Sequence, residues 1–230
     1  MHQHGFSQAV LVQPSFLGTD NSFLLAALRT HADRLRGIAV TAPDATSDEL
    51  SALDRSGIVG LRLNLIGQAD PEFATDLWQR HLANVARLGW QIEVQVEAHR
   101  LPNILPPLLA AGVDVVIDHF GKPDPILGVD DPGFRYLLSA GASRRVWVKL
   151  SGAYRSGGIE RGGAIAAAAI PLLKRSLGLD RLVWGSDWPH TQFEPVMDYS
   201  ATRALLDDWL PDPRERRQVL AETPRRLFRF

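Results

Sequence analysis

The stretch LVWGSDWPH, residues 182–190, joins a short apolar run to a turn that carries polar side chains. Its first three residues predict a buried strand, which ends at Gly185. Asp187 and His190 then follow at the carboxyl end of that strand. A carboxylate at such a position is costly to desolvate unless it is paired or catalytic. Because active sites of parallel-strand barrels are built at the carboxyl ends of the strands, Asp187 is the first candidate for a catalytic residue.

The rest of the chain repeats this alternation of apolar runs and amphipathic stretches. Runs rich in Val, Ile and Leu are typical of strands that are buried on both faces. They predict strands at Ala9–Gln13, Gly37–Thr41, Val59–Leu65, Gln91–Glu97, Val113–His119, Val146–Ser151 and Leu182–Asp187. The amphipathic stretches predict helices at Asn21–Leu35, Asp48–Ser56, Pro71–Leu88, Leu101–Ala111, Asp131–Ala140, Ala164–Leu177 and Met197–Leu210. Such serial βα units favour a parallel sheet with helices outside it.

This order predicts the α/β class and a TIM (β/α)₈-type barrel. A complete barrel needs eight βα units and about 250 residues, whereas seven units are predicted in these 230 residues. The amino end is abrupt, so we expect the first β-strand and most of the first helix to be missing. No linker or low-complexity tract divides the chain. Residues 1–230 are therefore expected to form a single barrel domain that is incomplete at its N-terminus.

Composition limits the expected partners. The chain has 25 basic and 26 acidic residues, and this balance gives no reason to expect nucleic acid or an anionic membrane as a partner. The lack of cysteine excludes disulfides and thiolate chemistry, and it fits a reducing cytoplasm. No apolar run reaches the roughly 20 residues that span a bilayer. We expect a cytoplasmic protein that acts on a small molecule, with oligomer formation left open.

Polar side chains also follow the strand predicted at Val113–His119. His119 at such a strand end can act as an acid, a base, a metal ligand or a group that polarises a carbonyl. The adjacent Asp118 favours a functional role over a structural one. Lys122, three residues further on, is expected either to hold a substrate carboxylate or to be solvated.

Cationic side chains lie late in one further predicted strand and directly after another. Arg62 lies late in an otherwise apolar strand and needs an anionic partner, either a bound ligand or an internal carboxylate such as Glu93 or Asp118. Tyr154 and Arg155 leave the strand predicted at Val146–Ser151, where they could clamp a carboxylated ligand or form an ordinary polar loop.

Two other features are not expected to form a site. The glycine pairs at 157–158 and 162–163 lack the spacing of a phosphate-binding loop, so this segment is predicted to be a mobile loop. His2 and His4 have the His-x-His spacing of strand-borne metal ligands. No apolar residues surround them, and they are predicted to lie in a frayed end.

Taken together, these motifs resemble the amidohydrolase superfamily. Within it, they resemble the group of 2-pyrone-4,6-dicarboxylate lactonases and related sugar and muconolactone lactonases. The matching stretches span nearly the whole chain in family order, at residues 10–15, 18–21, 60–64, 118–122, 149–152 and 185–190. The resemblance implies a barrel like that of metal-dependent hydrolases, acting on a lactone of a small and often carboxylated compound.

The resemblance also implies roles for the candidate residues. Asp187 would be the general base that takes a proton from water, and His119 would polarise the carbonyl or bind a metal. The expected substrate-binding residues are Arg62, Lys122, Tyr154, Arg155 and His190. The family includes lactonases without a metal and enzymes with a divalent metal such as zinc, for which His119 and Asp187 are the candidate ligands here.

Three functional hypotheses follow. The leading one is hydrolysis of a lactone of a carboxylated or sugar-acid compound by water attack. The first alternative is a metal-dependent decarboxylase of the same superfamily, which would release carbon dioxide. The second is an inactive truncated remnant, because members of the family carry a His-x-His pair on a first strand that this sequence lacks.

Overall fold

The computed structural model describes residues 4–230, in which seven strands are hydrogen-bonded in chain order in one sheet. All seven predicted strands are present, each beginning within two residues of its predicted start. They are β1 (Ala9–Val12), β2 (Leu35–Ala39), β3 (Ile58–Asn64), β4 (Gln91–Gln95), β5 (Asp114–Ile117), β6 (Val146–Leu150) and β7 (Leu182–Trp184). His2 lies outside the described residues, so the expectation for the His2 and His4 pair is not described further.

Helices alternate with the strands, as the amphipathic stretches predict. They are α1 (Ser22–Thr30), α2 (Ser47–Arg55), α3 (Asp76–Arg87), α4 (Leu101–Ala110), α5 (Pro132–Ala140), α6 (Gly158–Ser176), α7 (Tyr199–Trp209), α8 (Pro213–Arg217) and α9 (Thr223–Leu227). Within residues 4–230, no helix combines the length and the apolar character that a membrane crossing needs.

The chain divides into two compact units. The first unit comprises Met1–Val94, Asn103–Val116 and Leu227–Phe230, and the second comprises Gln95–Pro102 and Ile117–Arg226. The first unit therefore holds β1 to β3 and most of β4 and β5, while the second holds β6 and β7. A single barrel domain over residues 1–230 stays a prediction.

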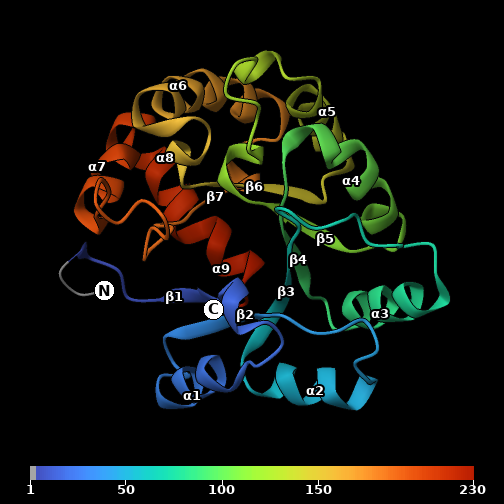
Figure 1. The fold of residues 1–230 in the computed structure, drawn as a ribbon. Helices are drawn as coiled ribbons and strands as arrows, with labels where there is room; N and C mark the ends of the chain where they lie inside the picture. The colour runs from blue at the N-terminus through green and yellow to red at the C-terminus, as the bar shows by residue number, and fades with distance from the viewer. Residues whose placement is uncertain (1–3) are drawn as a thin grey trace. The chain divides into compact units, whose positions relative to one another are not determined.

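In the first unit, β2 pairs in parallel with both β1 and β3. The register runs from Ala9 opposite Leu35 to Val12 opposite Ile38, and an irregularity at Gly37 shifts the pairing with β3. Figure 1 shows α1 and α2 along the same side of these strands, and their apolar faces pack there. Most of β2 and the first half of β3 are buried, as the continuous apolar runs predict, and Ile38 is fully buried; β1 is only half-buried along its length.

In the second unit, β6 and β7 pair in parallel, with Val148 opposite Leu182 and Leu150 opposite Trp184. The Gly185 N–H donates to the Leu150 carbonyl at 3.2 Å, so the ladder continues one residue past β7. Figure 1 shows α5, α6 and α7 following one another along the outer side of this unit. The candidate site residues of this unit lie in the segments that follow the carboxyl ends of its strands.

The start of α6 corrects one prediction. The segment with the two glycine pairs was expected to be a mobile loop, yet the helix begins at Gly158 and runs through Gly162. A Cβ atom at Gly162 would lie only 2.0 Å from the Ala153 carbonyl oxygen. The mobile-loop prediction was therefore wrong, because the glycine lets the helix lie against the turn that carries Tyr154 and Arg155.

Candidate active site

Asp187 lies in the turn after β7, and its two carboxylate oxygens have different partners. Oδ2 accepts a hydrogen bond from the Tyr154 hydroxyl at 2.5 Å and another from Arg155 Nε at 2.6 Å. Oδ1 lies 3.8 Å from Nε2 of His119. The Asp187 side chain is only 13% exposed. One oxygen is thus held by the protein, while the other faces the histidine.

This setting keeps Asp187 ionised. Burial opposes ionisation, but the nearby imidazole of His119, the positive charge of Arg155 and the hydrogen bonds from Arg155 and Tyr154 outweigh it. The pKa of the Asp187 carboxyl is consequently held below its ordinary value of 3.8. At neutral pH the group can only accept hydrogen bonds and protons.

His119 is held by its neighbours in a defined orientation. Its ring is buried, and Nδ1 lies 2.9 Å from the Ser151 hydroxyl oxygen. Burial lowers the pKa of His119 below its ordinary value of 6.5, although the charges of Asp118 and Asp187 oppose that shift. The ring is therefore neutral at neutral pH. When Nδ1 accepts a hydrogen bond from Ser151, Nε2 carries the ring hydrogen and faces Asp187.

A buried ion pair lies behind this histidine. Lys149 Nζ is 2.8 Å from Oδ1 of Asp118, and the Asp118 side chain is almost completely buried. Lys149 is therefore held in an internal ion pair at this position. Since Lys149 and Ser151 are two residues apart along an extended segment, they share one face. That spacing could have identified Ser151, which sequence reasoning missed as the partner of His119.

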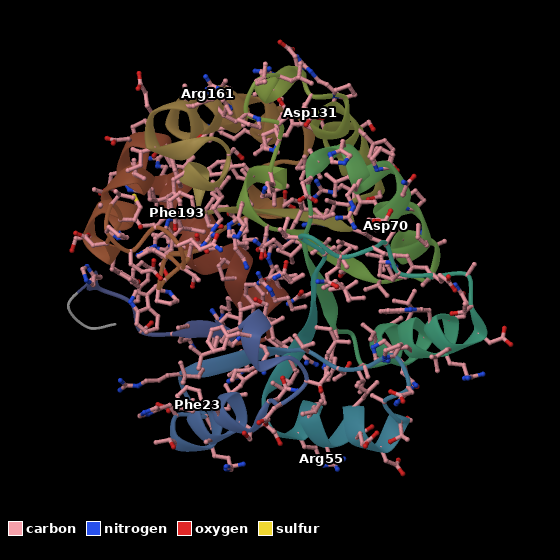
Figure 2. All side chains as sticks on the ribbon, viewed as in Figure 1. Phe23, Arg55, Asp70, Asp131, Arg161 and Phe193 are labelled. Atoms are coloured by element: carbon pink, nitrogen blue, oxygen red, sulfur yellow. The ribbon has the colours of Figure 1, made fainter. Side chains whose placement is uncertain are left out.

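Tyr154 and Arg155 lie in the short 3₁₀ turn η7 (Ala153–Arg155), directly after Gly152. Gly152 has a φ of +52°, and a Cβ atom there would be 2.7 Å from His119 Nδ1 and 2.8 Å from Asp187 Oδ2. The position therefore needs glycine for two reasons. The Arg155 guanidinium lies over the Phe193 ring at 5.6 Å; Phe193 is labelled in Figure 2.

His190 reaches the same cluster from the turn that carries Asp187. Its Nδ1 lies 3.1 Å from the Tyr154 hydroxyl oxygen, and the residue is only 2% exposed. Burial is the main cause of a lowered pKa for its imidazole. Asp187, His119, Tyr154, Arg155 and His190 thus form one contiguous cluster in the second unit.

Two predicted substrate-binding residues have other surroundings. In the first unit, Arg62 NH1 lies 2.6 Å from Oε1 of Glu93, so the internal ion pair proposed as its alternative role is present. Lys122 follows the turn η4 (His119–Gly121) and is half-buried, and it forms no ion pair with a carboxylate of residues 4–230. Substrate binding by either residue stays a prediction.

Comparison with known proteins now places the chain. The model of the amidohydrolase family matches residues 1–230. The chain belongs to this family. A 4-sulfomuconolactone hydrolase of Hydrogenophaga intermedia is 31% identical to this amidohydrolase over 97% of the chain and 75% of the relative. A 2-pyrone-4,6-dicarboxylate hydrolase of Comamonas testosteroni is 29% identical over 97% of the chain and 76% of the relative.

A solved structure supports the same assignment. It is described as a probable 2-pyrone-4,6-dicarboxylic acid hydrolase from Acinetobacter baumannii with citric acid bound. It is 42% identical to the amidohydrolase, with a TM-score of 0.96 over 100% of this chain and 86% of that chain. The predicted superfamily and the predicted α/β barrel fold are both confirmed.

The superfamily raises the question of a metal ion. A zinc site needs three or four protein ligands in a tetrahedral arrangement. No group of three or more His, Cys, Asp or Glu side chains that could hold a metal occurs in the described part of the chain. His119 Nε2 and Asp187 Oδ1 supply two donors, and the other Asp187 oxygen is occupied by Tyr154 and Arg155. These residues by themselves do not fit a metal site, and a divalent metal stays a prediction.

Proposed function

We propose that this amidohydrolase opens a small anionic lactone, with Asp187 as the base that activates water. The observation that carries this proposal is that the two oxygens of the Asp187 carboxylate have different partners. Oδ2 is held by Tyr154 and Arg155, whereas Oδ1 faces Nε2 of His119 at 3.8 Å. A water molecule can hydrogen-bond to both facing atoms at about 2.8 Å each. The reaction class agrees with the lactone hydrolases to which the chain is similar, as the sequence predicted.

The reaction then balances without any further reactant. The water oxygen bonds to the lactone carbonyl carbon while Asp187 Oδ1 takes one proton, and the carbonyl electron pair moves onto its oxygen. When the ring C–O bond breaks, the carbonyl re-forms and the departing ring oxygen takes the proton from Asp187. The product is the opened acid, and Asp187 returns to its ionised form.

The cations of the site have two uses in this scheme. The positive charge of Arg155 stabilises the ionised Asp187 and, together with the N–H of His119, the negative charge that develops on the carbonyl oxygen. Lys122 is proposed to hold a substrate carboxylate, because it pairs with no carboxylate within residues 4–230. Tyr154 is proposed to shape the binding site from the side of Oδ2, with His190 buried behind it, so the predicted contact of His190 with substrate is not part of this proposal. A carboxylated or sulfonated lactone fits this charge better than a neutral one.

The test is hydrolysis of a panel by the purified 230-residue chain. The panel contains 2-pyrone-4,6-dicarboxylate, 4-sulfomuconolactone and a neutral sugar lactone. We expect ring opening of at least one anionic lactone and a loss of about 100-fold or more in kcat for Asp187→Asn, the usual contribution of a general base. Asp130→Asn is the matched control, because it removes an exposed carboxylate whose ion pair among residues 4–230 is with Arg135.

Three results would contradict the proposal. An unchanged kcat in Asp187→Asn would show that Asp187 is not the general base. Release of carbon dioxide from a carboxylated substrate, without ring opening, would favour the decarboxylase hypothesis instead. Hydrolysis of the neutral sugar lactone alone would refute the assignment of an anionic substrate.

A further inference from the structure

The buried ring of His190 has no part in the reaction described above, although it touches a residue that holds the base. We propose that His190 is a positioning residue that acts on Asp187 through the Tyr154 hydroxyl. This inference rests on the proposed function, because it assumes that Asp187 is the catalytic base. It assigns His190 a role at a distance from the substrate.

The directions of the hydrogen bonds follow from their chemistry. The Tyr154 oxygen lies 2.5 Å from Asp187 Oδ2 and 3.1 Å from His190 Nδ1. An ionised carboxylate has no hydrogen to donate, so the Tyr154 hydroxyl must donate to Asp187. The tyrosine oxygen can then only accept from His190. Nδ1 of His190 must therefore carry the ring hydrogen, and the chain runs from His190 through Tyr154 to Asp187.

The other ring nitrogen of His190 supports this assignment. Burial keeps the imidazole neutral, so a hydrogen on Nδ1 leaves a lone pair on Nε2. Nε2 is buried, and no residue of the described chain forms a hydrogen bond with it. Leaving a buried acceptor unpaired costs free energy, which a side chain present only for packing would avoid. Within residues 4–230, the ring of His190 therefore forms one hydrogen bond, to Tyr154.

The backbone adds a second link between His190 and Asp187. The His190 N–H donates to the Asp187 carbonyl at 2.8 Å, which closes a turn from 187 to 190. Both residues have positive φ, +59° for Asp187 and +63° for His190. This turn directs the carboxylate and the imidazole of one loop to the same hydroxyl of the neighbouring turn η7. Tyr154 thus connects the two ends of the turn that presents the base.

This arrangement would keep Oδ1 of Asp187 available for water. Donation from His190 fixes the orientation of the Tyr154 hydroxyl and strengthens its hydrogen bond to Oδ2, because linked hydrogen bonds polarise one another. Without His190, the hydroxyl could rotate and the carboxylate could turn. The loss would fall on kcat rather than on substrate binding, since His190 is buried behind Tyr154.

Two substitutions at position 190 separate the hydrogen bond from the backbone. Asn tolerates the positive φ and places an N–H₂ group near the former Nδ1, whereas Gly tolerates the same φ but offers no side-chain donor. We expect kcat to fall about three- to tenfold in His190→Gly, as for the loss of one hydrogen bond, with KM changed by less than about twofold. His190→Asn should recover most of this loss.

The same pair in a Tyr154→Phe background completes the experiment. If His190 acts through the hydroxyl, Asn and Gly at position 190 give equal kcat values once that hydroxyl is absent. The proposal would be overturned if the ratio of kcat between the Asn and Gly variants at position 190 were the same with Phe as with Tyr at position 154. An equal loss in both single variants would also overturn it, provided that circular dichroism shows both to be folded.

A measurement without substrate separates this inference from the proposed function. ¹⁵N NMR of the whole protein should show His190 as the neutral Nδ1–H tautomer, and Tyr154→Phe should reduce that preference. An Nε2–H tautomer in the unsubstituted protein would refute the chain of hydrogen bonds whatever the activity. If the tautomer is as expected but no lactone is opened, the hydrogen-bond chain from His190 to Asp187 is supported. The proposed function, and with it the catalytic role of that chain, is then refuted.

Discussion

Replacing Gly152 with alanine should impair catalysis far more than it impairs folding. The added Cβ would lie 2.7 Å from His119 Nδ1 and 2.8 Å from Asp187 Oδ2. Both contacts are well inside the 3.4 Å at which ordinary van der Waals contact begins, so each neighbour must retreat by about 0.6–0.7 Å. These neighbours are the two side chains that would activate water.

The two costs can be given separate magnitudes. A displacement approaching 1 Å in a reacting group costs up to about 100-fold in rate, so we expect kcat to fall about 10- to 100-fold. The φ of +52° at Gly152 adds backbone strain of about 1–2 kcal/mol, which lowers the free energy of unfolding. Loss of backbone entropy in the unfolded chain offsets about 0.4–1 kcal/mol of that strain.

Gly158→Ala is the matched control. Gly158 has a φ of +88°, yet its added Cβ would meet no other part of the described chain within 4 Å beyond its sequence neighbours and its own helix backbone. It therefore introduces backbone strain without touching the catalytic side chains. Steady-state kinetics on the best lactone of the panel and urea unfolding followed by tryptophan fluorescence would be measured for both variants. Equal kcat values in the two would refute the argument that Gly152 is required by the close approach of His119 and Asp187.

Two further predictions concern stability. Arg62→Met should lower the free energy of unfolding by about 3–5 kcal/mol, because it breaks the ion pair that Arg62 forms with the fully buried Glu93 carboxylate. Urea titration of this variant checks the loss, and the double variant with Glu93→Leu should recover most of it. Stability should also fall as the pH drops below 6.5, because burial lowers the pKa of His81, His119 and His190 in the folded chain, so that the unfolded chain binds more protons there. His119 alone contributes up to about 1.4 kcal/mol per pH unit in this range. A urea midpoint that is the same at pH 7.5 and pH 5.5 would contradict the second prediction.

The strands could be predicted because their signal is local. Runs of Val, Ile and Leu that end in a polar residue identify each strand, and all seven occur in the structure. The predicted carboxyl ends extended too far, since His119, Ser151 and Asp187 lie in the turns that follow β5, β6 and β7. This error in the strand ends is small, and all three residues still lie at the carboxyl end of the sheet, where a site is expected.

The contacts within the site could not be predicted in the same way. His119, Asp187 and His190 all have positive φ, at +51°, +59° and +63°. Glycine is the residue that most clearly marks such a conformation; Asp and His adopt it more often than most residues but far from always, so their presence does not predict it. The side-chain directions therefore depend on tertiary contacts that sequence patterns do not encode. For this reason the sequence indicated His190 as a site residue but not its link to Tyr154.

The low pKa of Asp187 also bears on which step its surroundings favour. A carboxylate with a depressed pKa is a weaker base than one whose pKa lies near the working pH, so it gains less from proton transfer alone. The rate must then depend more on the cations that stabilise the developing oxyanion, among them Arg155. Once protonated, however, the same carboxyl is a strong acid and readily returns its proton to the departing ring oxygen. A weak base that becomes a strong acid once protonated is better suited to a lactone whose carbonyl is already activated, by conjugation or by nearby cations, than to an unactivated sugar lactone.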